Sequence, residues 1–440
     1  MIRFYVYAVL FNLGILIFVH ELGHYLAARL SGVTVERFSM GFGPRILKFT
    51  RGATEYALSA IPFGGYVKMA GTEQPVDGDD TEFGPDTFLG KRLGIRALIV
   101  AAGPVTNLVW AFLVTVGVLL IAGLPTLGAP VIGEVEPGLP AAEAGLVTGD
   151  RILAVDGVEV ASWEDVVDAS SAVEGAVLLS VERGGGSGET VEVALDFAED
   201  DDTGAVDLGL SAYVPPVIGD VMSGGPADLA GIEPGDVVTH IDDVPVHTWN
   251  EIGEIIYESL GVELTVTWER DGEVMSARIV PEEGEEPVGN TDVRTVGMIG
   301  IMRSWETKRL GPGEAVTTAA RLTVANLLLI VDFFVDLATG KVSGSMVGGP
   351  IKVVQMASES ARWGASYFFG FMAFMSINLF LINMLPLPIL DGGHLLLMAL
   401  EKVRRRGLTE RQLMVWQQVG LIFFASLMVF LLVRDTLRFG

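Results

Sequence analysis

Apolar stretches long enough to cross a lipid bilayer constrain the fold of this 440-residue chain more than any other feature of its sequence. A membrane-spanning helix needs about 20 apolar residues, and residues 97–123, 366–385 and 414–433 each supply such a run. A fourth stretch, residues 4–30, is apolar up to Val19 and then carries ionisable residues within the same helical pattern. A cleaved signal peptide would carry its charges before the apolar core, so we interpret this stretch as an uncleaved first span. The sequence therefore predicts a multi-pass α-helical membrane protein with four transmembrane helices.

Acidic residues are concentrated between the second and third predicted spans. The formal net charge is -26, yet residues 124–310 alone hold 38 Asp and Glu against 8 Lys and Arg, so the rest of the chain is slightly basic. A negative field of this size repels nucleic acid, and the 50% hydrophobic content excludes a disordered chain. Because the sequence has no cysteine, disulfides, thiolate-bound metals and a thiol nucleophile are also excluded.

Basic residues near the span ends predict the orientation, because Lys and Arg are retained on the cytoplasmic side. They follow the first predicted span, precede the second, and lie between the third and fourth at 402–411. We therefore expect these two loops in the cytoplasm, and the acidic block and the C-terminus in the periplasm of a bacterium. Residues 319–338 are nearly long enough to span, but a span here would turn the 402–411 loop outward, and Asp332 and Asp336 fit poorly in hydrocarbon. We interpret this stretch as an amphipathic helix on the outer membrane face or packed on the core.

The acidic block contains an internal repeat. Residues 130–166 and 216–252 align without a gap at an offset of 86, and 16 of the 37 positions are identical, which indicates two copies of one domain. Each copy combines short predicted strands with a short helix, a Gly-Asp turn and a second helix, and it resembles the PDZ domains of bacterial proteases. Such domains bind extended peptides by strand addition. Glu134 and Asp220 beside the first strands would repel a substrate carboxylate, so the alternative role is exclusion of bulky proteins.

A metal-binding motif lies in the first predicted span, where His20, Glu21 and His24 form the pattern H-E-x-x-H. Residues four apart share one face of a helix, so both imidazoles can reach one metal ion. Two histidines and a carboxylate suit one catalytic Zn²⁺ and leave a fourth position for water, whose proton Glu21 is placed to accept. Ionisable residues are costly inside a membrane unless they have a function, which favours this interpretation over a buried polar contact between helices.

A third ligand is available at the cytoplasmic end of the third predicted span. Two prolines and two glycines interrupt the helix between Asn383 and His394, which a membrane tolerates only where the backbone lines a polar cavity or packs on protein. The predicted topology puts Asp391 at a depth similar to that of His20 and His24, so we prefer Asp391 as the third ligand. His394 is the rival, and we interpret it as a supporting or structural residue.

Together, these motifs and the tandem repeat resemble the site-2 protease family of intramembrane zinc metalloproteases over nearly the whole chain. The resemblance implies that His20, His24 and Asp391 bind one zinc ion and that Glu21 is the catalytic base. It further implies that Asn383 holds the unwound backbone or the oxyanion of the substrate.

Other segments of the chain resemble further elements of the same family. Residues 41–69 resemble its membrane-re-entrant β-hairpin, which offers an edge strand to the substrate, and they include Gly64 and Gly65. Asn378 matches a second substrate-binding asparagine of the family. Gly103, Pro104 and Asn107 match an element of its second span, and residues 348–351 match a short Gly-Pro-Ile element.

The resemblance implies an enzyme of the bacterial inner membrane whose active site faces the cytoplasm. Its expected partners are the lipid bilayer and single-pass transmembrane substrates already trimmed outside, such as an anti-sigma factor or remnant signal peptides, which the PDZ pair would bind or filter. The alternative is a non-catalytic membrane scaffold with two peptide-binding PDZ modules, which has no reason to keep a complete zinc-binding set.

The expected segments are a first span with the metal motif at 1–30, the re-entrant hairpin and a loop at 31–96, a second span at 97–123, PDZ domains at 124–214 and 215–304, periplasmic interfacial helices at 305–364, a third span at 365–391, a cytoplasmic loop at 392–413 and a fourth span at 414–434.

Overall fold

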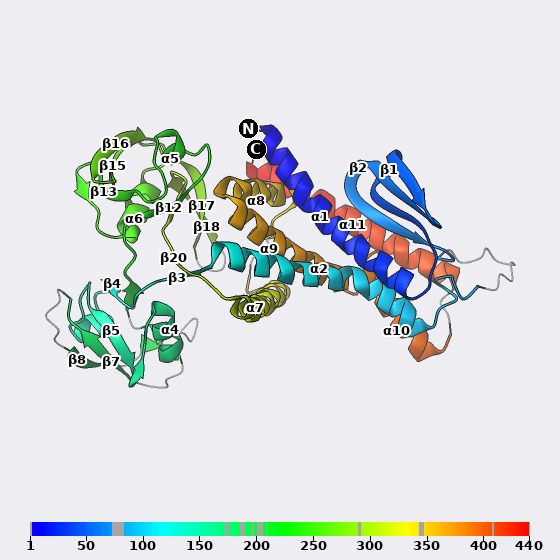
Figure 1. Cartoon of the computed structure of the whole chain (residues 1–440), viewed down its shortest axis with the longest axis horizontal. Helices are drawn as coiled ribbons and strands as arrows, with labels where there is room; N and C mark the ends of the chain where they lie inside the picture. The colour runs from blue at the N-terminus through cyan, green and yellow to red at the C-terminus, as the bar shows by residue number, and fades with distance from the viewer. Residues whose placement is uncertain are drawn as a thin grey trace. The chain divides into compact units, whose positions relative to one another are not determined.

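The computed structural model divides the chain into two compact units, one built mainly of long helices and the other of short strands and helices (Figure 1). The helical unit comprises Met1–Ile121 and Gly311–Gly440, and the strand-rich unit comprises Ala122–Leu310. The strand-rich unit is therefore an insertion in the chain of the helical unit, and its bounds coincide closely with the acidic block. The structure describes residues 2–72, 83–171, 176–184, 190–195, 198–199, 206–207, 209–288, 292–342, 347–406 and 409–439.

The helical unit contains seven of the described helices and one pair of long strands. They are α1 (Ile2–Leu30), β1 (Val35–Arg51), β2 (Thr54–Met69), α2 (Leu93–Ala122), α7 (Pro312–Thr339), α8 (Pro350–Trp363), α9 (Ala365–Met384), α10 (Asp391–Arg404) and α11 (Glu410–Phe439).

Among the described residues, five helices are long and apolar enough to cross a membrane, namely α1, α2, α7, α9 and α11. Four of them overlap the predicted spans almost completely, and α7 is the additional candidate. It packs on α2 and α9 through Ile330, which shares an apolar cluster with Ala111 and Ile377, while Asp332 is exposed. The helix thus contacts the core, as one of the two interpretations expected, whereas the number of spans stays a prediction.

The two long strands build a small sheet, because both bend near the middle and their halves pair separately. Residues 45–51 pair with 54–59, the latter pair with 37–40, and residues 35–40 also pair with 65–69. The predicted hairpin over 41–69 is therefore part of a larger arrangement that begins at Val35. Within the described part of the chain, residues 65–69 form one edge of this sheet.

Glycines and aromatic rings shape the sheet and attach it to α1. The bends coincide with Gly41 and Gly64, which have positive φ angles of 84° and 107°, a backbone region that glycine adopts without steric cost. Phe38 packs edge-on against Phe18 and Tyr25 of α1, with ring centroids 5.9 and 5.4 Å apart. The sheet therefore lies directly on the helix that carries the H-E-x-x-H motif.

The segment expected as a loop at 392–413 contains the helix α10. The two glycines that suggested a break lie in its first turn, where a Cβ on Gly392 would overlap the carbonyl oxygens of Met384 and Leu385. The glycines thus allow the Pro-rich turn to fold back onto the start of the helix. Lys402 and Arg404 in the last turn suit the negative end of the helix dipole.

Asp435, near the end of α11, connects that helix to the start of α8. Its buried carboxylate accepts hydrogen bonds from the backbone N–H groups of Gly349, Ile351 and Lys352, at 3.2, 3.1 and 3.4 Å. These are amides that have no partner within a helix. A side chain on Gly349 would overlap the carboxylate, so the glycine before Pro350 makes this contact possible.

The strand-rich unit contains two modules with the same order of elements, which correspond to the two copies of the sequence repeat. Each has one sheet of four strands, ordered β6-β5-β7-β8 or β14-β13-β15-β16, and one strand pair, β4 with β11 or β12 with β19. The first module contains β4 (Ile132–Val135), α3 (Pro140–Glu143), β5 (Arg151–Val155), β6 (Val158–Glu159), α4 (Trp163–Ser171), β7 (Val177–Glu182), β8 (Thr190–Leu195), β9 (Ala198–Glu199), β10 (Val206–Asp207) and β11 (Leu210–Ala212). The second contains β12 (Ile218–Val221), α5 (Pro226–Leu229), β13 (Val237–Ile241), β14 (Val244–Pro245), α6 (Trp249–Glu258), β15 (Leu264–Arg270), β16 (Glu273–Ile279), β17 (Glu282–Val288), β18 (Asp292–Met298) and β19 (Ile301–Arg303), while β3 (Leu124–Thr126) pairs with β20 (Glu306–Lys308).

The repeated Gly-Asp turn carries the same buried ion pair in both modules. Asp150 accepts from Arg183 at 2.7 Å, and Asp236 accepts from Arg270 at 2.6 Å. Both carboxylates are almost completely buried, and a buried charge is tolerated only when it is paired and hydrogen-bonded. The identity of these aspartates in the two copies therefore has a structural cause.

Candidate metal centre

Two histidines of α1 converge on one point beside α2. His20 and His24 lie one helical turn apart on the same face, and their Nε2 atoms are 3.3 Å from each other. The Nδ1 atom of His24 lies 2.9 Å from the carbonyl oxygen of Ile99 in α2. Because a carbonyl only accepts, this contact puts the proton of His24 on Nδ1 and leaves the lone pair of Nε2 free.

Asp391 reaches the same point from the start of α10. Its Oδ2 atom lies 3.1 Å from Nε2 of His20 and 3.5 Å from Nε2 of His24. The preceding turn runs through Ile389, whose φ of 78° is unusual for a β-branched residue. The Pro-rich segment therefore delivers the carboxylate from a part of the sequence more than 360 residues away from the histidines.

The three atoms fit a tetrahedral metal ion. Zinc bonds to nitrogen and oxygen of about 2.0–2.2 Å place neighbouring ligand atoms of a tetrahedron roughly 3.4 Å apart. The three separations here, 3.1, 3.3 and 3.5 Å, match this value. His20, His24 and Asp391 are also the one group of metal-ligating side chains found this close together among the described residues.

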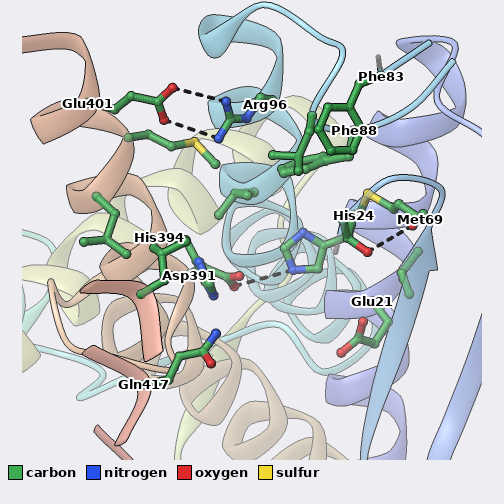
Figure 2. A pocket seen from close by; sticks show the side chains of 17 residues that line it. Glu21, His24, Met69, Phe83, Phe88, Arg96, Asp391, His394, Glu401 and Gln417 are labelled. Atoms are coloured by element: carbon green, nitrogen blue, oxygen red, sulfur yellow. Dashed lines mark hydrogen bonds and ion pairs between the residues drawn. The ribbon is translucent and has the colours of Figure 1, made fainter. Parts of the chain in front are cut away.

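A cavity of about 670 Å³ opens beside these ligands (Figure 2). Glu21, His24, Asp391 and His394 line it together with apolar side chains of the sheet and of α10. Glu21 follows the first ligand in sequence, and Figure 2 shows its carboxylate at the cavity wall below His24. The arrangement offers a carboxylate base, a metal site and space for a peptide segment in one place.

Small residues of α2 and of the sheet allow this close approach. A Cβ on Gly103 would overlap the imidazole of His24. A Cβ on Gly65 would stand 2.9 Å from Cγ of Glu21 and 3.0 Å from the carbonyl oxygen of Ser39. The edge segment 65–69 therefore lies directly beside the side chain of Glu21, and Gly65 is the point of contact.

Asn107 contacts the other histidine from α2. It is fully buried, and its Nδ2 atom lies 3.2 Å from Nδ1 of His20. Ser376 of α9 donates to the backbone carbonyl of Asn107 at 2.8 Å. The sequence marked Gly103 and Asn107 only by resemblance, and the structure shows that each contacts one histidine of the motif.

The remaining predicted residues lie at varying places around this centre. His394 lines the cavity but is not one of the three convergent residues, and burial lowers the pKa of His394. Asn378 donates to the carbonyl of Phe374 in its own helix at 2.9 Å, and Asn383 is half-buried in the last turn of α9. Neither asparagine lines the cavity, whereas Gly64 accommodates the ring of Phe42.

Sequence reasoning missed an ion pair at the far wall of the cavity. Arg96 of α2 faces Glu401 of α10, with contacts of 3.4 and 3.5 Å (Figure 2). Arg96 belongs to the basic residues that precede the second predicted span. Its partner is 305 positions away, and no local pattern indicates such a pair.

The sequence profile of peptidase family M50 matches residues 8–427. Three relatives are similar over almost their whole lengths. A Neisseria meningitidis protein named as a zinc metalloprotease is 36% identical over 446 residues, covering 97% of this chain and 96% of that protein. The regulator of sigma-E protease RseP of Escherichia coli is 34% identical, covering 97% of each chain, and the regulator of sigma E protease of Salmonella typhi is 33% identical, covering 98% of each.

Among solved structures, the PDZ domain of the SdrC-like protein from Listeria monocytogenes is similar to part of the chain. The identity is 19%, the TM-score is 0.17, and the match covers 20% of this chain and 90% of that domain.

Proposed function

The chain belongs to peptidase family M50 and is a zinc metalloprotease, and we propose that it hydrolyses peptide bonds within the transmembrane segments of other proteins. His20, His24 and Asp391 bind the zinc ion, and Glu21 is the catalytic base. The observation that carries this proposal is the convergence of three ligand atoms at 3.1 to 3.5 Å beside a cavity that Glu21 also lines. Membership of a family of zinc metalloproteases argues against the alternative, a non-catalytic membrane scaffold.

Each residue of the centre has a distinct chemical role in the proposed reaction. Zinc, when bound, polarises the scissile carbonyl and acidifies a water molecule. Glu21 accepts the proton of the attacking water and passes it to the leaving amide nitrogen. Asp391 would compensate part of the positive charge of the ion.

Substrate binding uses the edge of the sheet. A transmembrane helix hides its peptide bonds in its own hydrogen bonds, so hydrolysis requires local unwinding. Residues 65–69 form an edge strand of the sheet, to which an unwound segment can add as a further strand. The contact between Gly65 and Glu21 supports this role, because a strand paired here would run past the base. Asn383 hydrogen-bonds the freed backbone, and Gly64 permits the bend that presents the edge.

The two modules act outside the membrane as PDZ domains that bind or exclude substrates. Their common order of elements and their place as an insertion between membrane helices support this assignment. The net charge of the block makes its surface strongly acidic. A peptide with a free carboxylate would be repelled by it, which favours exclusion of bulky outer domains over capture of C-termini.

The chain is a multi-pass protein of the inner membrane, as its apolar helices and its relatives indicate. We place the modules in the periplasm and the metal centre toward the cytoplasm. The names of its relatives describe regulation of sigma E, so a single-pass anti-sigma factor, trimmed on its outer side, is the proposed substrate class. Remnant signal peptides have the same form and are the second class.

Two variants of the purified full chain test the proposal. Glu21→Gln should keep one equivalent of zinc and slow cleavage of a model transmembrane substrate by roughly 10²–10⁴-fold, the contribution of general base catalysis. Asp391→Ala should lose zinc as measured by mass spectrometry, because a three-ligand site cannot lose one ligand without a large loss of affinity. Asp332→Asn, exposed on α7, is the matched control. Cleavage by Glu21→Gln at the wild-type rate would refute the assignment of the base.

A further inference from the structure

Asn107 has an unusual environment for an amide side chain. It is fully buried in α2, and one end of its amide faces Nδ1 of His20 at 3.2 Å. The opposite end has no hydrogen-bond partner within the described part of the chain. A buried polar group of this kind is costly, so a requirement other than stability accounts for the asparagine.

The amide can adopt two orientations, which differ in what they demand of His20. With Nδ2 toward the ring, Nδ1 must accept, and the single proton of the neutral imidazole then sits on Nε2. With Oδ1 toward the ring, Nδ1 carries the proton and donates it to Asn107. The oxygen and nitrogen of an amide are assigned from their surroundings, and each orientation makes one hydrogen bond with His20. The contact with His20 alone therefore does not distinguish the two orientations.

The geometry of the metal site distinguishes the two orientations of the amide. Nε2 of His20 points at Oδ2 of Asp391 and Nε2 of His24, at 3.1 and 3.3 Å. A proton on this nitrogen would occupy the lone pair that a metal ion needs. Only the orientation with Oδ1 toward Nδ1 leaves this lone pair available.

We propose that Asn107 is a positioning residue that accepts the Nδ1 proton of His20 through Oδ1 and so fixes the metal-binding tautomer. The inference rests on the proposed role of His20 as a zinc ligand. His24 is held in the same way, because its Nδ1 atom faces the carbonyl of Ile99. One helix thus supplies an acceptor to each histidine, and Ser376 holds the backbone of Asn107 in place through its 2.8 Å hydrogen bond. Partners of this kind outside the ligands are typically worth about 10–100-fold in metal affinity.

Three variants of the full chain test the role of the acceptor. Asn107→Asp keeps an oxygen toward His20, whereas Asn107→Leu has a similar shape and no acceptor. Asn12→Leu is the control, because Asn12 is a buried asparagine of α1 whose amide has no partner in the described structure. In competition with a zinc chelator, Asn107→Leu should bind zinc about 10–100-fold more weakly than wild type. The zinc affinities of Asn107→Asp and Asn12→Leu should stay within about threefold of wild type, well below the effect of losing such a partner. The cobalt-substituted Asn107→Leu should also show an altered absorption spectrum.

Two results would overturn the inference: wild-type zinc affinity in Asn107→Leu, or an equal loss in Asn107→Asp and Asn107→Leu. A wild-type chain without zinc would instead refute the proposed function, so the two failures are distinguishable. Nitrogen NMR of the metal-free, histidine-labelled wild type needs no variant, and the chain has only 5 histidines. The proposal predicts that His20 carries its proton on Nδ1 before metal binds, and a proton on Nε2 would contradict it.

Discussion

Gly103 of α2 lies against the imidazole of His24 so closely that a single methyl group on its Cα would overlap the ring. The same crossing brings Gly23 of α1 against the backbone carbonyl of Ala102. Both helices therefore expose bare backbone where they cross, and the metal centre occupies the space that this leaves.

Gly103→Ala should displace the ring of His24 and weaken zinc binding. Overfilling a packed site costs about 1–3 kcal/mol, which corresponds to roughly a 5- to 150-fold loss of affinity if it falls on the bound state. Gly117→Ala is the control, because nothing lies within 4 Å of a Cβ at Gly117 in the same helix. Chelator competition measures both, and equal affinities would show that the ring tolerates the methyl group.

Gly65→Ala should lower the catalytic rate without removing zinc. Its Cβ would stand 2.9 Å from Cγ of Glu21 and 3.2 Å from Cγ2 of Ile17, so the base must move while the three ligands do not. We expect kcat to fall by at least about tenfold, and by no more than the roughly 10²–10⁴-fold that general base catalysis contributes in full. The metal content should stay unchanged. Gly14→Ala, on α1 in open space, should leave both quantities unchanged. Loss of zinc in Gly65→Ala would contradict the separation of the two roles.

Asp435→Ala should destabilise the helical unit, because three backbone N–H groups at the start of α8 would lose their acceptor. Unsatisfied buried donors cost about 1–3 kcal/mol. Thermal unfolding of the full chain in detergent should show a lower Tm, with zinc affinity retained. Asp332→Ala, an exposed residue on α7, serves as the comparison. An unchanged Tm for Asp435→Ala would mean that water replaces the carboxylate without cost.

The second module should lose stability in acid through Asp236. Burial alone would raise the pKa of Asp236, but hydrogen bonds from Arg270 and from the amide of Glu233 outweigh it and hold the pKa below its usual range. Because the folded pKa is lower than the unfolded value of about 3.9, the ionised carboxylate stabilises the module above that pH. This contribution is lost as the pH falls through the folded pKa.

Hydrogen exchange measured by mass spectrometry can follow this loss in β13 and β15. Asp236→Asn should increase exchange there at pH 7 and make it less dependent on pH between about 2 and 5, the range in which carboxylates titrate. Glu269→Gln, exposed on β15, should behave as the wild type does. A wild-type pH profile in Asp236→Asn would show that another group controls acid unfolding.

Much of the site could be predicted from sequence, because its functional residues occur in short motifs that are recognisable without knowledge of the fold. The four-residue spacing of His20 and His24 fixes a shared helix face, and the broken segment before Asp391 indicates a polar cavity. The repeat in the acidic block likewise identified two modules of one architecture. In each case a periodicity or a rare residue type in an apolar setting carries the signal.

The parts that sequence missed depend on contacts between distant residues. Arg96 and Glu401 are separated by 305 positions, and Asp435 and Gly349 by 86. The sheet was expected as a simple hairpin because alternation predicts strands but not which halves pair. The helix α10 lies in the predicted connection between the third and fourth spans, and sequence does not indicate it because glycines disfavour helices. Here Gly392 and Gly393 allow close contact with the preceding turn.

The crossing of α1 and α2 has a mechanical consequence. His20 and His24 are four residues apart on one helix, and their neighbours Asn107 and Gly103 are four residues apart on the other, in the reverse direction. A shift of one helix along the other by a single residue, about 1.5 Å, would therefore break the contact of His20 with Asn107 and that of His24 with Gly103 at the same time. Because both contacts depend on one register of α1 and α2, any opening of the cavity has to come from its other walls, which the sheet, residues 83–89, α10 and α11 supply.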